Sequence, residues 1–190
     1  GKKYIFENLT HKFHACCHGT HSTIEALLHL KNKFRIDLDD IDNISIFIHP
    51  QYLNVCNILL PKTSLEAKFS YKMITSMVMN EINTSLVQSF SDEICRDENI
   101  LSFMKIVDVY PSKEILETSS KVTIKTKSKK IFTYEYDLNN LKSINDRKNK
   151  MILKTSSLLG NKMSVSLWNL LENEEELPSN WIWNNYNKNL

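Results

Sequence analysis

Ten residues, from Lys12 to His21, bring together side chains that can bind an anion or move a proton. They read Lys-Phe-His-Ala-Cys-Cys-His-Gly-Thr-His and continue directly into Ser-Thr-Ile-Glu-Ala-Leu-Leu. Ser22 and Glu25 have the spacing of a capping box, which predicts a helix that begins near Thr23. The free N–H groups of its first turn and the positive end of its dipole would then lie beside an ammonium group and several imidazoles. This combination predicts a site for a carboxylate or a phosphate.

The same segment, together with the Ile-Glu-Ala-Leu that follows, resembles a motif of the MmgE/PrpD family. A second stretch, Pro61–Ser70, reads Pro-Lys-Thr-Ser-Leu-Glu-Ala-Lys-Phe-Ser and resembles the family's Glu-Ala-(Arg/Lys)-Phe-Ser helix start. A third, looser likeness is the strand and hairpin region Ile106–Tyr136. The family includes 2-methylcitrate dehydratases, cis-aconitate decarboxylases and iminodisuccinate epimerases. The resemblance therefore implies a lyase or isomerase that removes a proton next to a carboxylate of a small di- or tricarboxylate, without a metal or organic cofactor.

The resemblance also implies roles for individual residues. Lys12 takes the place of an active-site lysine, whose charge can hold a carboxylate and stabilise the enolate-like charge left by proton removal. His21 is the second catalytic candidate, as a hydrogen-bond partner of the substrate or a proton carrier, although it could instead fasten the turn to a backbone carbonyl. The candidate substrate-binding residues are His14, Cys17, His18, Ser22 and Met73.

Two positions depart from the family pattern. Cys17 stands where some members have a histidine, and Met73 stands where several relatives have an active-site tyrosine, three residues after the family serine. The nearby Tyr71 would point about 200° away from Met73 on a helix. These departures leave open a second interpretation, a non-catalytic binding or interaction domain derived from the same fold. Retention of Lys12 and His21 favours the enzyme.

Family members are much longer and carry a helical domain ahead of the domain that these motifs mark. The chain begins Gly1-Lys2-Lys3, close to the lysine motif. We therefore expect the carboxy-terminal, substrate-capping part of a family member, either a natural fragment or a trimmed form. Its expected partners are the polycarboxylate substrate, the amino-terminal helical domain of the same protein and a second copy in a homodimer. Without the helical domain, we expect no turnover.

Bulk composition excludes several classes. Lys and Arg number 24 against 22 Asp and Glu, for a net charge of +2, so no basic excess points to nucleic acid. No apolar run approaches the roughly 18 residues of a membrane span. Four cysteines are too few for a disulfide framework and indicate a reducing compartment, the cytoplasm or the mitochondrial matrix. The histidines and cysteines between His11 and His21 match no closed four-ligand pattern, so no metal site is predicted.

Hydrophobic periodicity predicts the elements that position these residues. The fold class is α+β: a small mixed or antiparallel sheet with flanking helices over residues 1–142, followed by a helical segment over 143–190. That segment would pack on the missing helical domain, and otherwise either self-associates or folds back on the sheet. The predicted elements are helices Thr23–Lys33, Leu65–Asn80 (capped by Ser64), 98–104 (capped by Asp97), 144–159 (closed by Gly160) and Ser164–Glu172, and strands Asn43–His49, Ile106–Tyr110, Val122–Thr126 and Ile131–Tyr136, the last two joined by a turn longer than two residues.

Overall fold

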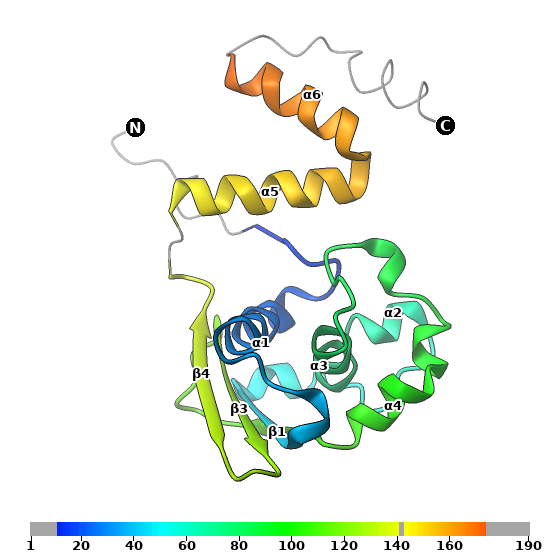
Figure 1. Cartoon of the computed structure of the whole chain (residues 1–190), viewed down its shortest axis with the longest axis vertical. Helices are drawn as coiled ribbons and strands as arrows, with labels where there is room; N and C mark the ends of the chain where they lie inside the picture. The colour runs from blue at the N-terminus through cyan, green and yellow to red at the C-terminus, as the bar shows by residue number, and fades with distance from the viewer. Residues whose placement is uncertain (1–10, 141–142, 174–190) are drawn as a thin grey trace. The chain divides into compact units, whose positions relative to one another are not determined.

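The computed structural model describes residues 11–140 and 143–173, which fall into two compact units divided between Leu141 and Lys142 (Figure 1). The first unit is built on a four-stranded sheet in the order β2-β1-β3-β4. Strand β1 runs parallel to β2 and antiparallel to β3, and β3 is antiparallel to β4. The predicted α+β class with a mixed sheet and flanking helices is confirmed. The strands are β1 (Ile41–Ile48), β2 (Val107–Pro111), β3 (Ser119–Thr126) and β4 (Ile131–Asp137).

The core lies between one face of the sheet and the helices that cover it (Figure 1). Ile44, Ile46 and Ile48 alternate along β1 and are fully buried, as the sequence pattern predicts. Helix α1 (His21–Phe34) packs on β3 and β4, and α3 (Tyr71–Met79) packs on β2 and α1. Because α1 contacts both α3 and the sheet, it is held from two sides.

Helix α1 does not begin as its sequence predicts. The predicted capping box of Ser22 and Glu25 is wrong: a 3-10 turn, His18–Thr20, leads directly into α1, and no side chain caps the helix. The Ser22 hydroxyl instead lies 2.8 Å from the hydroxyl of Ser120 on β3. Glu25 instead contacts His14. Both presumed capping side chains therefore make contacts outside the first turn of the helix, Ser22 with a distant strand and Glu25 with the segment that precedes α1.

The predicted single helix Leu65–Asn80 is two helices, α2 (Ser64–Ala67) and α3. Thr63, rather than Ser64, caps α2 by accepting a hydrogen bond from Glu66 N–H. Ser70 has extended backbone angles and caps α3, its hydroxyl accepting from Met73 N–H. A serine in the middle of a helical pattern thus ends one helix and starts the next, as a good N-cap residue can.

Helix α4 (Glu98–Met104) begins at Asp97, whose carboxylate accepts hydrogen bonds from the first turn, as predicted. The β3–β4 hairpin closes through Lys127, Ser128 and Lys129, since Thr126 N–H donates to the Lys130 carbonyl. Lys129 takes a positive φ of 65°. The expected turn of more than two residues is confirmed, and a non-glycine residue adopts the left-handed conformation that it requires.

The second unit contains α5 (Ile144–Leu159), which is capped by Ser143 and closed by Gly160 at φ 80°. The closing role of Gly160 was predicted from the sequence and is confirmed. Helix α6 (Asn161–Glu172) begins three residues before the predicted Ser164. Thr155 joins the two helices: its hydroxyl lies 2.7 Å from that of Ser164 and accepts from the Trp168 indole at 2.9 Å. The apolar tail with Trp181 and Trp183 lies outside the described residues. None of the helices within residues 11–140 and 143–173 is both long and apolar enough to cross a membrane.

Candidate functional site

The segment that precedes α1 is fixed by hydrogen bonds to distant parts of the first unit. Ala15 N–H donates to the Thr84 carbonyl at 2.8 Å, and Cys17 N–H donates to the Lys68 carbonyl at 3.0 Å. Thr20 folds the turn back, because both its N–H and its hydroxyl donate to the Cys17 carbonyl. The segment is therefore positioned by the break between α2 and α3 and by the loop after α3, as well as by its own turn.

Gly19 allows a close approach in this turn. A Cβ at that position would lie 2.5 Å from the ring of Tyr52, so no other residue fits without a shift of the ring. The Gly19 carbonyl accepts a 2.9 Å hydrogen bond from the buried Tyr71 hydroxyl. Burial raises the pKa of Tyr71, which keeps the phenol protonated as a donor.

Three imidazole rings form a row at the start of α1. The ring of His21 makes edge-to-face contacts with His14 and with His18, each with centroids 5.0 Å apart. We call these three residues the histidine row. Each comes from a different part of the motif. His14 lies in the irregular segment before the 3-10 turn, His18 begins that turn, and His21 is the first residue of α1.

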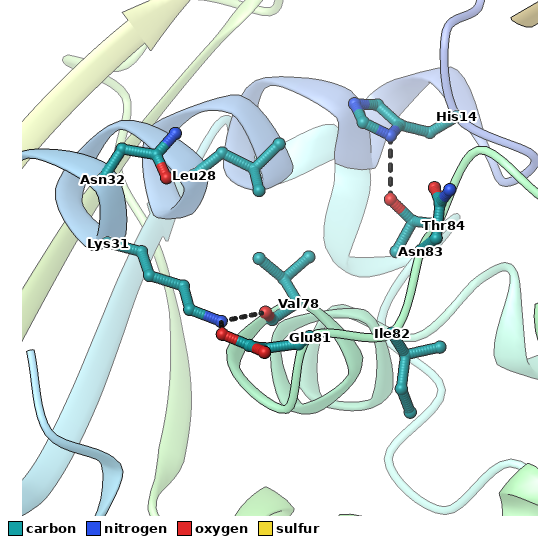
Figure 2. A pocket seen from close by; sticks show the side chains of 9 residues that line it. All are labelled: His14, Leu28, Lys31, Asn32, Val78, Glu81, Ile82, Asn83 and Thr84. Atoms are coloured by element: carbon teal, nitrogen blue, oxygen red, sulfur yellow. Dashed lines mark hydrogen bonds and ion pairs between the residues drawn. The ribbon is translucent and has the colours of Figure 1, made fainter. Parts of the chain in front are cut away.

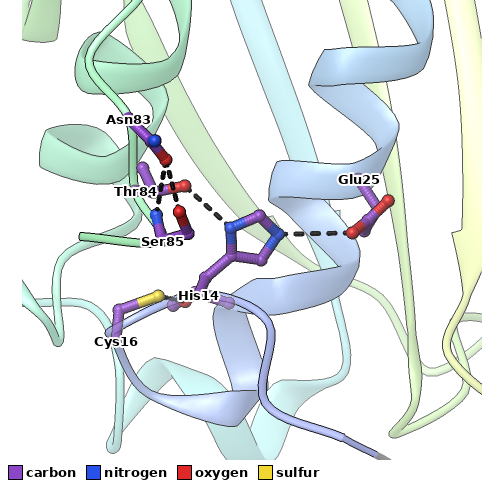
Figure 3. A network of polar contacts seen from close by, with 7 residues as sticks. His14, Cys16, Glu25, Asn83, Thr84 and Ser85 are labelled. Atoms are coloured by element: carbon purple, nitrogen blue, oxygen red, sulfur yellow. Dashed lines mark hydrogen bonds and ion pairs between the residues drawn. The ribbon is translucent and has the colours of Figure 1, made fainter. Parts of the chain in front are cut away.

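His14 forms one end of the row and is held by two side chains (Figure 3). Its Nδ1 lies 2.8 Å from the Thr84 hydroxyl, and its Nε2 lies 3.3 Å from the Glu25 carboxylate. His14 and Glu25 are both buried, with 7% of their surface exposed. Because each ring nitrogen has its own partner, these two contacts fix the orientation of the His14 ring.

His21, in the centre of the row, is 1% exposed. Burial lowers its pKa from 6.5 to about 3, helped by the charges of His14, His18 and Lys12, while a hydrogen bond with the Cys16 backbone raises it. Its Nε2 has no hydrogen-bond partner among the described residues. Because a neutral imidazole has one donor and one acceptor nitrogen, a ring that donates to Cys16 through Nδ1 presents Nε2 as an acceptor.

His18 and Lys12 make up the more open side of the site. His18 is partly buried and its pKa is lowered, first by burial and then by the charge of Lys12. Lys12 is exposed, and its charge acts on both His18 and His21. The structure therefore places four of the predicted site residues, Lys12, His14, His18 and His21, in one electrostatically connected group.

The model of the MmgE/PrpD C-terminal domain matches residues 14–139, well over half of the 190-residue chain. The chain belongs to the MmgE/PrpD family. A comparison with curated proteins found no match. The matched range contains the whole histidine row together with Cys17 and Met73, and begins two residues after Lys12.

The other three predicted site residues, Ser22, Cys17 and Met73, make packing contacts or hydrogen bonds within this MmgE/PrpD domain. Ser22 is buried against Ser120, as described above. Cys17 is half-buried, and its sulfur accepts from the thiol of Cys56. Met73 is fully buried in α3 and belongs to the apolar core.

Sequence reasoning missed three residues that hold the motif in place: Thr84, Ser120 and Tyr71. Thr84 lies in a polar loop and Ser120 at the start of a strand, and no local pattern singles them out. The sequence points to Tyr71 only as a tyrosine near Met73, whereas in the structure its hydroxyl reaches the Gly19 carbonyl.

A pocket of about 320 Å³ lies next to His14, between α1 and the end of α3 (Figure 2). Lys31 crosses it, donating to the Met79 carbonyl at 3.0 Å and pairing with Glu81 at 3.1 Å. Within the part of the chain that the structure describes, no three His, Cys, Asp or Glu side chains are grouped to hold a metal ion. The pocket shares His14 and Thr84 with the network that supports the histidine row.

Proposed function

We propose that this chain is the carboxylate-binding, carboxy-terminal part of an MmgE/PrpD enzyme that acts on a small di- or tricarboxylate. The reaction class is proton removal next to a carboxylate, followed by loss of water or CO2, or by epimerisation. One observation carries the proposal: His21 is almost fully buried, yet its Nε2 has no partner among the described residues. A buried polar atom without a partner is costly, and a bound ligand would remove that cost.

Binding rests on charge more than on the helix N-terminus. The N–H groups of Thr20 and His21 already donate within the 3-10 turn, to the carbonyls of Cys17 and His18. Lys12, which is exposed beside the row, supplies the cation for a carboxylate. An ammonium group acts as a compact point charge that can follow a substrate into place.

Proton transfer would use His21. With a pKa of about 3 the ring is neutral at physiological pH, so Nε2 can accept a proton, but it is a weak base. A carboxylate bound nearby stabilises the imidazolium and raises the pKa towards the working range. The ring therefore becomes an effective base only once an anionic substrate is present. Lys12 then stabilises the charge that develops on the substrate.

Catalysis needs acid and base groups on both faces of the substrate. We propose that the second face comes from the amino-terminal helical domain of the same protein, in a homodimer located in the cytoplasm or the mitochondrial matrix. The alternative is a binding domain without catalysis, supported by Cys17 and Met73 at family positions for histidine and tyrosine. A natural reading frame that continues upstream with helical periodicity would favour the enzyme.

The test is a titration of the chain with citrate, itaconate or aconitate, followed by histidine side-chain NMR shifts. We expect His18 and His21 to shift, and Lys12→Ala to weaken the response. Lys33→Ala is the matched control, because Lys33 is exposed near the other end of α1. Shifts confined to His29, which stacks on Tyr134, and to His49 would contradict the proposal.

A further inference from the structure

The sulfur atoms of Cys17 and Cys56 lie 3.1 Å apart, although the residues are 39 positions apart in the sequence. All four cysteines of the chain are free thiols. Cys17 is partly exposed in the turn before α1, and Cys56 is fully buried after the 3-10 turn Pro50–Leu53. A disulfide bond is about 2.05 Å long, so the two sulfurs need to approach by only about a further 1 Å.

Both backbones are held in place around this pair. Cys17 is fixed by the hydrogen bonds with Lys68 and Thr20 described above. Cys56 N–H donates to the Tyr52 carbonyl at 2.8 Å, and its own carbonyl accepts from Tyr71 N–H at 3.1 Å. The two thiols are thus kept together by the fold and not by a chance rotamer of a mobile loop.

We propose that Cys17 and Cys56 form a modification site, in which a hydroperoxide oxidises the pair to a reversible disulfide. The Cys17 thiolate attacks one oxygen of hydrogen peroxide, the O–O bond breaks, and Cys17 sulfenic acid and hydroxide form. The Cys56 sulfur then attacks the Cys17 sulfur, the S–O bond breaks, and the departing hydroxyl leaves as water with the Cys56 proton. The two sulfurs lose two electrons in total, and the peroxide gains them. A dithiol then reduces the disulfide back to two thiols by exchange and is itself oxidised to a disulfide.

The exposure of the two thiols indicates which one reacts with the peroxide first. Cys17 is the thiol that a small oxidant can reach, because Cys56 has no exposed surface. Burial, together with the Cys17 sulfur, raises the pKa of Cys56, so this residue stays a thiol and donates its S–H towards Cys17. Cys16 is buried, and its sulfur lies 3.2 Å from the Thr20 hydroxyl.

Disulfide formation has a readout in the histidine row that does not depend on ligand binding. Cys17 directly precedes His18, and its carbonyl accepts hydrogen bonds from both the N–H and the hydroxyl of Thr20. Formation of a bond between the Cys17 and Cys56 sulfurs therefore changes the surroundings of the turn that carries His18. We expect the NMR signals of His18 and His21 to shift on oxidation and to return on reduction.

The experiment treats the full chain with hydrogen peroxide and then counts thiols and maps peptides by mass spectrometry. We expect the four free thiols to fall to two, with a Cys17–Cys56 peptide that a dithiol releases. Cys56→Ser should leave Cys17 as a sulfenic acid that dimedone captures. Cys95→Ser is the matched control, because Cys95 is buried and contacts Thr63 and Ser91 instead. This variant should still form the Cys17–Cys56 disulfide.

Three results would overturn the proposal. They are a disulfide that uses Cys16 or Cys95, over-oxidation of Cys17 without a bond to Cys56, and a bond only between two chains. If Cys56→Ser does not fold, the wild-type peptide map still decides the question, because it needs no variant.

Discussion

The hydroxyl of Tyr71 donates a 2.9 Å hydrogen bond to the carbonyl oxygen of Gly19. The two residues are 52 positions apart, and both are buried. The bond joins helix α3 to the turn that carries the histidine row. Tyr71 therefore helps to position the turn that precedes α1.

Tyr71→Phe removes this donor and leaves the buried Gly19 carbonyl without it. We expect the free energy of unfolding to fall by about 1–2 kcal/mol, the cost of an unsatisfied buried acceptor. Chemical denaturation measures the change. The control is Tyr110→Phe on the edge strand β2, where the side chain is 43% exposed and loss of the hydroxyl should change stability little. Equal effects for the two variants would contradict this role of Tyr71.

Gly19→Ala places a methyl group against the Tyr52 ring, within 2.5 Å. Because a ring cannot bend away like a flexible chain end, we expect a loss of about 1–3 kcal/mol in stability, typical of overpacking. Thermal unfolding measures it. In the double variant with Tyr52→Ala the methyl group no longer meets a ring, so the loss of stability should be smaller than the sum of the two single losses. A loss equal to that sum would argue against the steric explanation.

His21 should remain neutral in the folded protein down to about pH 3, whereas an unfolded histidine titrates near 6.5. Between these values the unfolded state binds one more proton, so His21 lowers stability as pH falls below about 6.5 and has no such effect above it. The slope is about 1.4 kcal/mol per pH unit. His21→Asn should remove that slope from unfolding measured at several pH values. An NMR titration of His21 near pH 6.5 would contradict the prediction.

The chain alone should show no appreciable turnover of 2-methylcitrate, cis-aconitate or iminodisuccinate. The reason is that the proposed groups face the substrate from one side only. Dehydratase, decarboxylase and epimerase assays check this. Citrate titration of the same preparation serves as the control, because an anion response shows that inactivity is not misfolding. Robust turnover that Lys12→Ala abolishes would refute the expectation.

The segment after Ser143 should drive self-association. Helix α5 has no buried residue. Several apolar side chains of α5 and α6 are largely exposed, among them Ile144, Leu153, Leu158 and Val165. Exposed apolar surface of this kind favours a partner, and a symmetric dimer lets one patch cover its own copy. Light scattering should give a dimer for the intact chain and a monomer for a chain truncated after residue 142. A monomeric intact chain whose truncation unfolds the rest would show that the segment completes the core instead.

The sequence allowed accurate prediction where the evidence was local. Alternating isoleucines predicted β1, Asp97 predicted the start of α4, and Gly160 predicted the end of α5. The break between α2 and α3 could not be predicted, because Glu-Ala-Lys-Phe is a good helical sequence. Tertiary hydrogen bonds decide it: the Lys68 carbonyl accepts from Cys17, and the Phe69 carbonyl accepts from Ile58.

The candidate site shows the same division. The clustering of Lys12 and the histidines within ten residues was visible in the sequence. The capping box was not what its spacing indicated, because Ser22 and Glu25 found partners elsewhere in the fold. Nothing in the local pattern could show that Thr84 would reach His14, or that Ser120 would meet Ser22.

These distant partners affect when the site can form as the protein folds. Ser22 and Ser120 are 98 residues apart, and His14 and Thr84 are 70 residues apart. Contacts this far apart must wait for most of the chain, since closing long loops is entropically costly and slow. A peptide with the whole Lys12–His21 motif would carry the same side chains without their arrangement. Anion binding would therefore report complete folding of the first unit and not merely the presence of the motif.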